Sequence, residues 1–124
     1  MSLLDWISKN TYATRTDSPE PELRPRSYRK PMSEVLAAAQ SAVGAIPRWK
    51  VEEVSEKDSK IHATRTTGLF RFVDDIYIDV AAGADGRLEL NVHSKSRVGK
   101  GDFGQNRRNI LELMKQLDAR VKAE

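Results

Sequence analysis

The sequence contains no cysteine, and this absence excludes several kinds of chemistry at once. Without cysteine the chain has no disulfide framework, no thiol nucleophile and no cysteine-based zinc site. Its two histidines, His62 and His93, stand far apart and lack the close spacing of a metal-binding pair. We therefore expect neither a bound metal nor any other cofactor.

Long hydrophobic runs are also missing. No apolar stretch approaches the roughly 18 residues that a membrane span needs. The N-terminal segment MSLLDWISKN has no basic region before its short apolar stretch and no cleavage site made of small residues. These absences predict a soluble, cytoplasmic protein. With 124 residues, the chain is long enough for one domain with its own core.

Charge is distributed unevenly along the chain, whose formal net charge is +3. Residues 49–91 carry six basic and nine acidic side chains, whereas residues 92–110 carry five basic and one acidic. Focused positive charge attracts anions, but this excess is smaller than that of a typical nucleic-acid-binding tail. We therefore expect an anionic small molecule or an acidic protein surface as partner, and we do not expect nucleic acid.

The N-terminal part differs from the rest in composition. We assign residues 1–32 to an extended, proline-rich arm and residues 33–124 to a single α+β domain. Residues 16–31, TDSPEPELRPRSYRKP, contain four prolines, and each restricts both its own φ and the conformation of the preceding residue. The arm is either a disordered leader or an ordered segment packed over the domain, with Leu23 and Tyr28 as its anchors.

A helix is predicted to begin at Ser33, which has the side chain of an N-cap residue. Glu34 then lies in the first turn, where the helix dipole favours an acid. Gly44 and Pro47 end the helix. The apolar residues that share one helical face are Val35, Leu36, Ala39, Val43 and Ile46.

Four segments then alternate polar and apolar residues as strands do: RWKVEEV, KIHATRT, LFRFVDDIYIDVAA and RLELNVHS. In the third, Ile76, Ile78 and Val80 share one face, while Tyr77 lies on the other. The two histidines alternate with apolar residues, so we expect both on the polar face. One apolar face predicts an antiparallel sheet with helices on one side.

The last helix is predicted to begin at Phe103, with Asp102 and Gln105 as a capping box. The predicted fold is therefore α+β, with a four-stranded antiparallel sheet flanked by an N-terminal and a C-terminal helix in the order α-β-β-β-β-α. A helix-grip arrangement, in which the sheet curls around the last helix and encloses a cavity, is left open. The apolar positions of this helix are Phe103, Ile110, Met114, Leu117 and Val121.

Two motifs, FVDDIYIDV and HSKSRVGKGDFGQNRRNI, together with PRWKV and IHATRTT, resemble the domain-of-unknown-function family 1499, which occurs in bacteria and plastids. The resemblance covers roughly residues 33–118. It implies a compact α+β domain and brings no established activity, substrate or cofactor. Family members often carry a cysteine near an Asn in the N-terminal arm. This chain has none, so a cysteine-dependent role is in doubt.

The passage from Ser94 to Asn109, which we name the corner, has the composition of an anion site. Gly99 and Gly101 would expose backbone N–H groups, and a helix N-terminus carries free donors. The spacing matches neither a Walker loop nor a dinucleotide-binding motif. The predicted ligand-binding residues are Ser94, Ser96, Arg97, Lys100, Asp102, Asn106 and Arg107.

The same corner also fits a purely structural latch between strand and helix. Asp102 as N-cap would oppose an incoming anion, and Asp74 or Asp75 offers Arg97 a bidentate carboxylate partner. On this interpretation Asn106 satisfies loop groups, and the passage holds the last helix against the sheet. The sequence leaves both interpretations standing.

Asp74 and Asp75 are the weak catalytic candidates. Neighbouring residues on a strand point to opposite faces, so the two cannot act as paired carboxylates without a bulge. One of them, if buried among apolar neighbours, would have a raised pKa and serve as a general base.

Three functions follow from these patterns. The leading one is a non-catalytic binding or protein-interaction module with its site at the corner. The first alternative is an enzyme that acts on a carboxylated or phosphorylated small molecule with Asp74 or Asp75 and Arg97. The second is weak nucleic-acid binding. Exposed strand faces also allow pairing with a second copy. The basic residues of the nucleic-acid hypothesis are Lys95, Lys100, Arg107 and Arg108.

Overall fold

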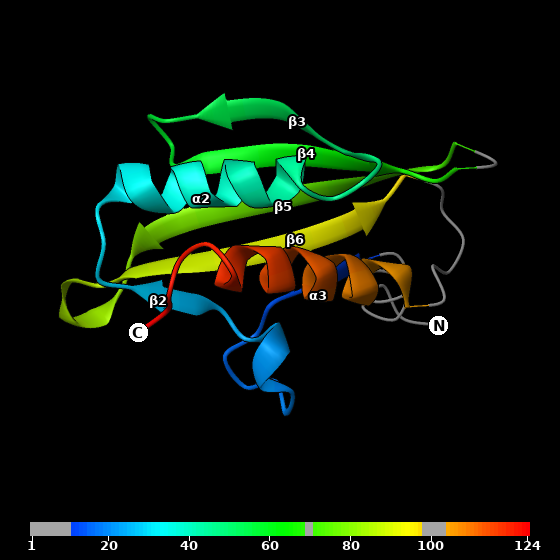
Figure 1. Cartoon of the computed structure of the whole chain (residues 1–124). Coiled ribbons are helices and arrows are strands. Elements are labelled where there is room, and N and C mark those ends of the chain that lie inside the picture. The colour runs from blue at the N-terminus through cyan, green and yellow to red at the C-terminus, as the bar shows by residue number, and fades with distance from the viewer. Residues whose placement is uncertain (1–10, 69–70, 98–103) are drawn as a thin grey trace.

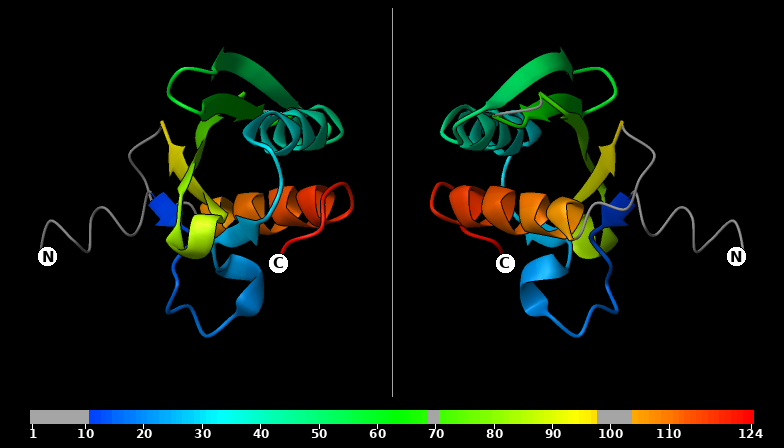
Figure 2. Two further views of the ribbon diagram at one scale, coloured as in Figure 1. Left: turned by 90° about the vertical axis from the view of Figure 1, so that its left-hand side faces the viewer. Right: turned by 90° about the vertical axis from the view of Figure 1, so that its right-hand side faces the viewer.

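The computed structural model describes residues 11–68, 71–97 and 104–124 of the chain. Within these residues it is a six-stranded antiparallel sheet with two helices on one face (Figures 1 and 2). The strands are β1 (Thr11–Ala13), β2 (Arg26–Tyr28), β3 (Trp49–Ser55), β4 (Lys60–Thr66), β5 (Val73–Ala82) and β6 (Leu88–Ser96). The helices are α2 (Met32–Gly44) and α3 (Gln105–Asp118), with short 3-10 helices η1 (Pro21–Leu23) and η2 (Ala84–Gly86).

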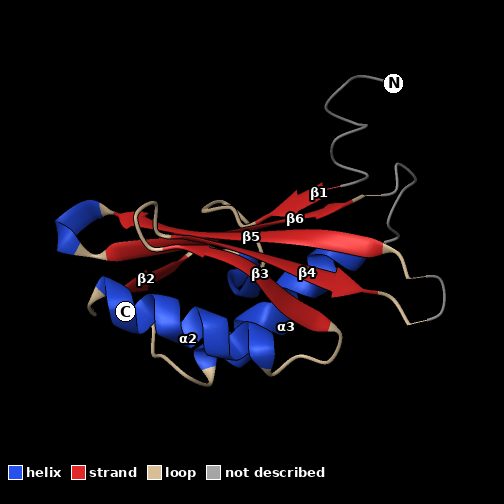
Figure 3. Ribbon diagram, turned by 90° about the horizontal axis from the view of Figure 1, so that it is seen from above, coloured by secondary structure: helices blue, strands red, loops and turns tan. Residues whose placement is uncertain are grey.

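The strand order is β1-β6-β5-β4-β3. β2 also pairs with β6, but with an earlier part of that strand than β1 does. The last four strands follow one another as a meander, which places sequence neighbours side by side. In the view from above, both helices lie on the same side of the sheet, toward the bottom of the picture (Figure 3). The sheet therefore has an inner face, packed against α2 and α3, and an outer face that no described helix covers.

The predicted fold class is confirmed, but the predicted number of strands is wrong. The two extra strands come from the arm: β1 pairs with residues 93–95 of β6, and β2 pairs with residues 88–90. Each has only three residues, too few for an alternating pattern to show in the sequence. Their extended state depends on hydrogen bonds to β6, which is tertiary context.

The predicted helix starts also need correction. α2 begins at Met32 after Pro31, and no side chain caps it, so Ser33 is not the N-cap. α3 begins at Gln105 and not at Phe103, with Gly104 at the N-cap position in a left-handed conformation, φ 82°. Glycine adopts this φ without steric cost. Asp102 and Phe103 lie outside the described residues.

The core lies between the inner face and the two helices. The three β5 residues predicted to point inward, Ile76, Ile78 and Val80, are all buried there. The two arm residues named as anchors, Leu23 and Tyr28, belong to the same core. The helices contribute buried residues that include Val35, Leu36, Ala39 and Val43 from α2 and Ile110, Leu113, Met114 and Leu117 from α3.

Tyr28 tests how strongly the arm is held. Its side chain is 0% exposed, and its hydroxyl has no hydrogen-bond partner among the described residues. We expect Tyr28→Ala to lower the free energy of unfolding by about 3–5 kcal/mol, because it leaves a cavity in the core. Tyr28→Phe is the matched control and should change it by less than about 1 kcal/mol, because no hydrogen bond is lost. Urea denaturation followed by circular dichroism measures both; equal values for the two variants would contradict the packing.

Candidate functional site

The two adjacent aspartates of β5 point to opposite faces of the sheet. Asp74 lies on the inner face, and Asp75 lies on the outer face with Tyr77. No bulge interrupts the pairing of β5 with β4 or β6 at these positions, so strand geometry alone separates the two carboxylates. The structure therefore holds two distinct polar sites, one on each face.

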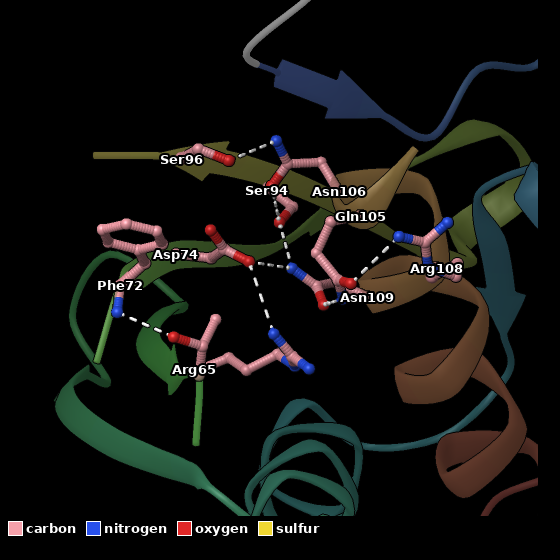
Figure 4. A network of polar contacts seen from close by, with 10 residues as sticks. Arg65, Phe72, Asp74, Ser94, Ser96, Gln105, Asn106, Arg108 and Asn109 are labelled. Atoms are coloured by element: carbon pink, nitrogen blue, oxygen red, sulfur yellow. Dashed lines mark hydrogen bonds and ion pairs between the residues drawn. The ribbon is translucent and has the colours of Figure 1, made fainter. Parts of the chain in front are cut away.

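On the inner face, Asp74 belongs to a buried network that we call the inner cluster: Asp74, Ser94, Ser96, Asn106 and Asn109 (Figure 4). Asn109 donates from Nδ2 to Asp74 Oδ2 at 2.9 Å and to Ser94 Oγ at 3.1 Å. Ser94 Oγ donates to Asn106 Oδ1 at 2.7 Å, and Asn106 Nδ2 donates to Ser96 Oγ at 3.0 Å. The inner cluster thus connects β5, β6 and the first turns of α3.

Two further residues border the inner cluster. Arg65 of β4 stands directly opposite Asp74, and its Nη1 lies 3.9 Å from Asp74 Oδ2. Gln105 Nε2 donates to Asn109 Oδ1 at 2.7 Å. The sequence carried a signal for Arg65, because every second residue from Ile61 faces inward, and Arg65 follows Ile61 and Ala63 in that series. A cation on the apolar face of a strand needs an anion beside it, and Asp74 is that anion.

The inner cluster connects the strand and the helix that the latch interpretation expected Arg97 to join; it includes the expected Asn106, while Ser94 and Asn109 were not part of that expectation. Ser94, Asn106 and Asn109 are 0% exposed, so these three side chains are closed to a ligand. They join the exit of β6 to α3 through serine and asparagine side chains. The expected carboxylate–guanidinium pair exists, but it lies on the outer face and does not reach α3.

That pair joins Asp75 to Arg97. Arg97 donates from Nε to Oδ2 and from Nη2 to Oδ1, both at 2.9 Å, which is the bidentate geometry that a guanidinium favours. His62 Nε2 lies 2.7 Å from Asp75 Oδ1. The hydrogen bonds from Arg97, and secondarily the one with His62, hold the pKa of Asp75 below its ordinary value despite partial burial.

Three rings lie in a row across the outer face beside this pair. His62, Tyr77 and His93 are directly opposite one another on β4, β5 and β6. The His62 and Tyr77 rings are stacked at 4.8 Å with an interplanar angle of 10°, and the Tyr77 and His93 rings are 6.0 Å apart and tilted by 30°. Burial, and secondarily Lys95, lower the pKa of His93. We call these three residues the ring row.

A hollow of about 380 Å³ opens on the outer face along one side of the ring row, where Asp79 follows Tyr77 in β5. His62 and Tyr77 line it on one side, and the hairpin between β3 and β4 lines it on the other. Three of its lining residues are acidic, Glu53, Asp58 and Asp79, against one lysine, Lys60. On the other side of the ring row, where Asp75 precedes Tyr77 along β5, lie Lys95 and Arg97, so the charge on this face changes sign along the strands.

The remaining predicted site residues are divided. Lys100 and Asp102 lie outside the described residues. Arg107 forms an ion pair with Glu20 of the arm, and Arg108 donates to Gln105 Oε1 at 3.1 Å. Ser96 remains within the inner cluster. The structure therefore brings together Ser94, Ser96 and Asn106 on the inner face and places Arg97 apart from them on the outer face.

Comparison of the sequence with known protein families identifies the family of this domain. A family described as Protein of unknown function (DUF1499) matches residues 4–117 of the chain. The chain belongs to this family. The match begins within the arm, so the DUF1499 domain is longer than the 33–118 region suggested by its motifs. No curated protein matches the sequence.

Two properties of the DUF1499 domain bear on its chemistry. Across residues 11–68, 71–97 and 104–124, no three His, Asp or Glu side chains are grouped closely enough to hold a metal ion. In the same ranges, no helix combines the length and the apolar character that crossing a bilayer requires.

The inner cluster predicts a stability effect at Asn109. Asn109→Ala removes three hydrogen bonds and leaves the buried Asp74 carboxylate without its amide donor. We expect a loss of about 3 kcal/mol in the free energy of unfolding. Gln105→Ala is the control, since it removes only one partner of Asn109 and should cost less than about 1 kcal/mol. Urea unfolding compares them, and a smaller loss at Asn109 than at Gln105 would refute the latch role.

The Asp75–Arg97 pair predicts a pH dependence. Because the folded-state pKa of Asp75 is depressed, its contribution to stability is present above the unfolded carboxyl pKa of about 3.9 and is lost as pH falls through the lower folded value. Arg97→Met should therefore lower the urea midpoint near neutral pH.

The difference from the unsubstituted protein should shrink progressively as the pH falls below the unfolded carboxyl pKa of about 3.9 and through the lower folded pKa of Asp75. Urea midpoints of both proteins, measured in steps from about pH 7 to about pH 2, provide the comparison. A midpoint difference that stays constant over this range would show that Arg97 acts through packing and not through the charge of Asp75.

Proposed function

We propose that this DUF1499 domain is a non-catalytic binding module, and that it binds a small planar molecule carrying an anionic group on the outer face of its sheet. The observation that carries this proposal is the ring row, in which Tyr77 is exposed, with two basic side chains, Lys95 and Arg97, on one side of it. The inner cluster supports it by contrast, because its buried groups already bind one another and leave the outer face as the accessible polar surface.

Tyr77 is the centre of the proposed site. Its side chain is 42% exposed although it is a large aromatic residue in the middle of the sheet. Stacking on His62 fixes the plane of its ring, so a ligand ring that packs against the exposed part of Tyr77 pays little for ordering the tyrosine. Aromatic contacts of this kind contribute about 0.5–1.5 kcal/mol beyond the area they bury.

Lys95 and Arg97 supply the proposed anion contacts. Lys95 is exposed on the outer face and stands opposite Asp75. Arg97 is already paired with Asp75, but it uses only Nε and Nη2 in this contact, and a guanidinium has five N–H donors. The Nη1 group remains for a ligand, and the side chain is 53% exposed. Asp75 therefore holds Arg97 in place while part of the guanidinium group stays available to a ligand.

This proposal revises the site expected from the sequence. Arg97 stays in the ligand site, Lys95 and the ring row join it, and Ser94, Ser96 and Asn106 take the structural role of the inner cluster. An acidic protein surface is the other partner class with matching charge, but Lys95 stands only two strand positions from the partner of Tyr77, which favours a small molecule.

The enzyme hypothesis has one observation in its favour, the 2.7 Å contact between His62 Nε2 and Asp75 Oδ1. A carboxylate can orient an imidazole that acts as a base. Asp75 itself is a poor proton acceptor, because Arg97 holds its pKa below the ordinary value. Asp74 is enclosed within the inner cluster. Binding therefore accounts for more of the geometry than catalysis does.

Titration with three simple probes tests the proposal. Benzoate carries a ring and a charge, phenol carries the ring alone, and acetate carries the charge alone. We expect benzoate to shift the backbone amide signals of His62, Tyr77, His93 and Lys95 in NMR spectra more strongly than either partial probe, because it makes both contacts. Tyr77→Ala and Lys95→Gln should each weaken benzoate binding by about three- to tenfold.

The matched control is Phe72→Ala, which removes an exposed aromatic side chain that precedes the first residue of β5. It should leave benzoate binding unchanged. Benzoate shifts no larger than those of acetate, or an unaltered affinity in Tyr77→Ala, would reject the proposal. A gel shift with single-stranded DNA at low salt tests the nucleic-acid alternative, for which binding should fall steeply as salt rises.

A further inference from the structure

A second hollow, of about 370 Å³, lies at the end of the sheet where β3 begins and β4 ends. Its lining includes Arg48, Trp49 and Lys50 from the start of β3 and Thr66, Gly68 and Arg71 from the segments around the connection to β5. It shares no lining residue with the hollow beside Tyr77. We call it the basic hollow.

The charges of the basic hollow are all of one sign. Of the described residues that line it, Arg48, Lys50 and Arg71 are basic and none is acidic. Among the described residues, no carboxylate lies within ion-pair distance of Arg48 or Arg71, and Lys50 has only a distant contact, 3.9 Å, with Glu52. Three cations that face one space repel one another where carboxylates are this distant, and an anion between them removes that repulsion.

The backbone around the basic hollow is held in an unusual conformation. Arg48 and Arg71 both have a left-handed φ, 71° and 54°, which costs free energy in residues with a β-carbon. Strain of this kind persists where the surrounding structure enforces it and is frequent at binding sites. Here Thr66 N donates to the Arg48 carbonyl at 3.0 Å, and Phe72 N donates to Thr67 Oγ1 at 2.8 Å. These bonds fix both strained residues.

Gly68 and Arg48 fit closely together in the basic hollow. A β-carbon placed on Gly68 would come within 2.9 Å of the Arg48 guanidinium carbon. The absence of a side chain at Gly68 therefore allows the guanidinium to lie against the backbone. A methyl group there would displace the end of the arginine side chain without forcing the backbone to move.

The indole N–H of Trp49 is a buried donor that borders the basic hollow. Trp49 lines the hollow and is 7% exposed, yet its Nε1–H has no hydrogen-bond partner among the described residues. Buried N–H groups are almost always bonded, so an acceptor is expected at this end of the molecule.

We propose that the basic hollow is a second binding site, and that it takes a phosphate group. A tetrahedral dianion accepts hydrogen bonds from several directions. It therefore suits three cations arranged around one space better than it suits one planar guanidinium group. Arg48 and Arg71 bind the phosphate oxygens through their guanidinium groups, and Lys50 contributes a point charge. This site is independent of the ring row, since it uses neither Tyr77 nor Lys95 nor Arg97.

Titration of the full chain with inorganic phosphate tests this site, with sodium chloride at matched ionic strength as the reference. We expect saturable NMR shifts at the Trp49 indole N–H and at the backbone amides of Lys50, Gly68 and Arg71. Arg71→Gln should weaken phosphate binding about tenfold, as the loss of a charge-assisted hydrogen bond does. Arg29→Gln removes the same charge between β2 and α2, at the opposite end of the sheet (Figure 1), and should leave the affinity unchanged.

Gly68→Ala gives a test that does not remove any charge. Because only the flexible end of Arg48 must move, the variant should fold with an unchanged melting temperature and bind phosphate about three- to tenfold more weakly. Lys95→Gln should bind phosphate normally. Phosphate shifts no larger than those of chloride, full affinity in Gly68→Ala and Arg71→Gln, or loss of binding in Lys95→Gln would each overturn the proposal. The last result would place the anion on the ring-row face instead.

Discussion

The burial of one carboxylate, Asp74, is the constraint on which the corner of this domain depends. An ionised group that is 5% exposed is tolerated only when donors surround it. Asn109 supplies the closest donor and Arg65 the nearest positive charge. Because Asn109 belongs to α3 and Arg65 to β4, satisfying Asp74 fixes where the helix begins relative to the sheet. Ser94 and Asn106 extend the same network to β6.

The alternation of a strand then determines the role of the neighbouring residue. Asp75 must point to the outer face, where it meets Arg97 and His62 and not the helices. The two adjacent carboxylates therefore have opposite consequences. Asp74 binds buried side chains between the sheet and α3, whereas Asp75 holds Arg97 and His62 in place on an accessible surface. One dipeptide in β5 thus separates the stabilising polar groups from those that remain open to a partner.

Local patterns allowed part of this architecture to be predicted from the sequence. Alternation predicted the inward-facing Ile76, Ile78 and Val80 and the separation of the two aspartates. It failed for β1 and β2, since strands of three residues carry no period. It also failed for Asn109, because an asparagine in a helix gives no sign that a carboxylate will lie beside it. Arg65 was detectable in principle, as a charge among inward-facing apolar residues. Such pairings depend on register, which the sequence alone does not specify.

Counting charges along the chain missed the basic hollow for a related reason. Residues 49–91 are acidic in total, yet the meander brings the beginning of β3, the end of β4 and the beginning of β5 to one end of the sheet. Lys50 and Arg71 therefore meet Arg48 there, and Lys95 and Arg97 emerge at the same end from β6 (Figure 1). The acids Glu53, Asp58 and Asp79 line the hollow toward the other end. Antiparallel pairing thus gives the sheet charge of opposite sign toward its two ends, although the sequence is nearly balanced in charge. The end that attracts an anion is the one where β3 begins and β6 ends.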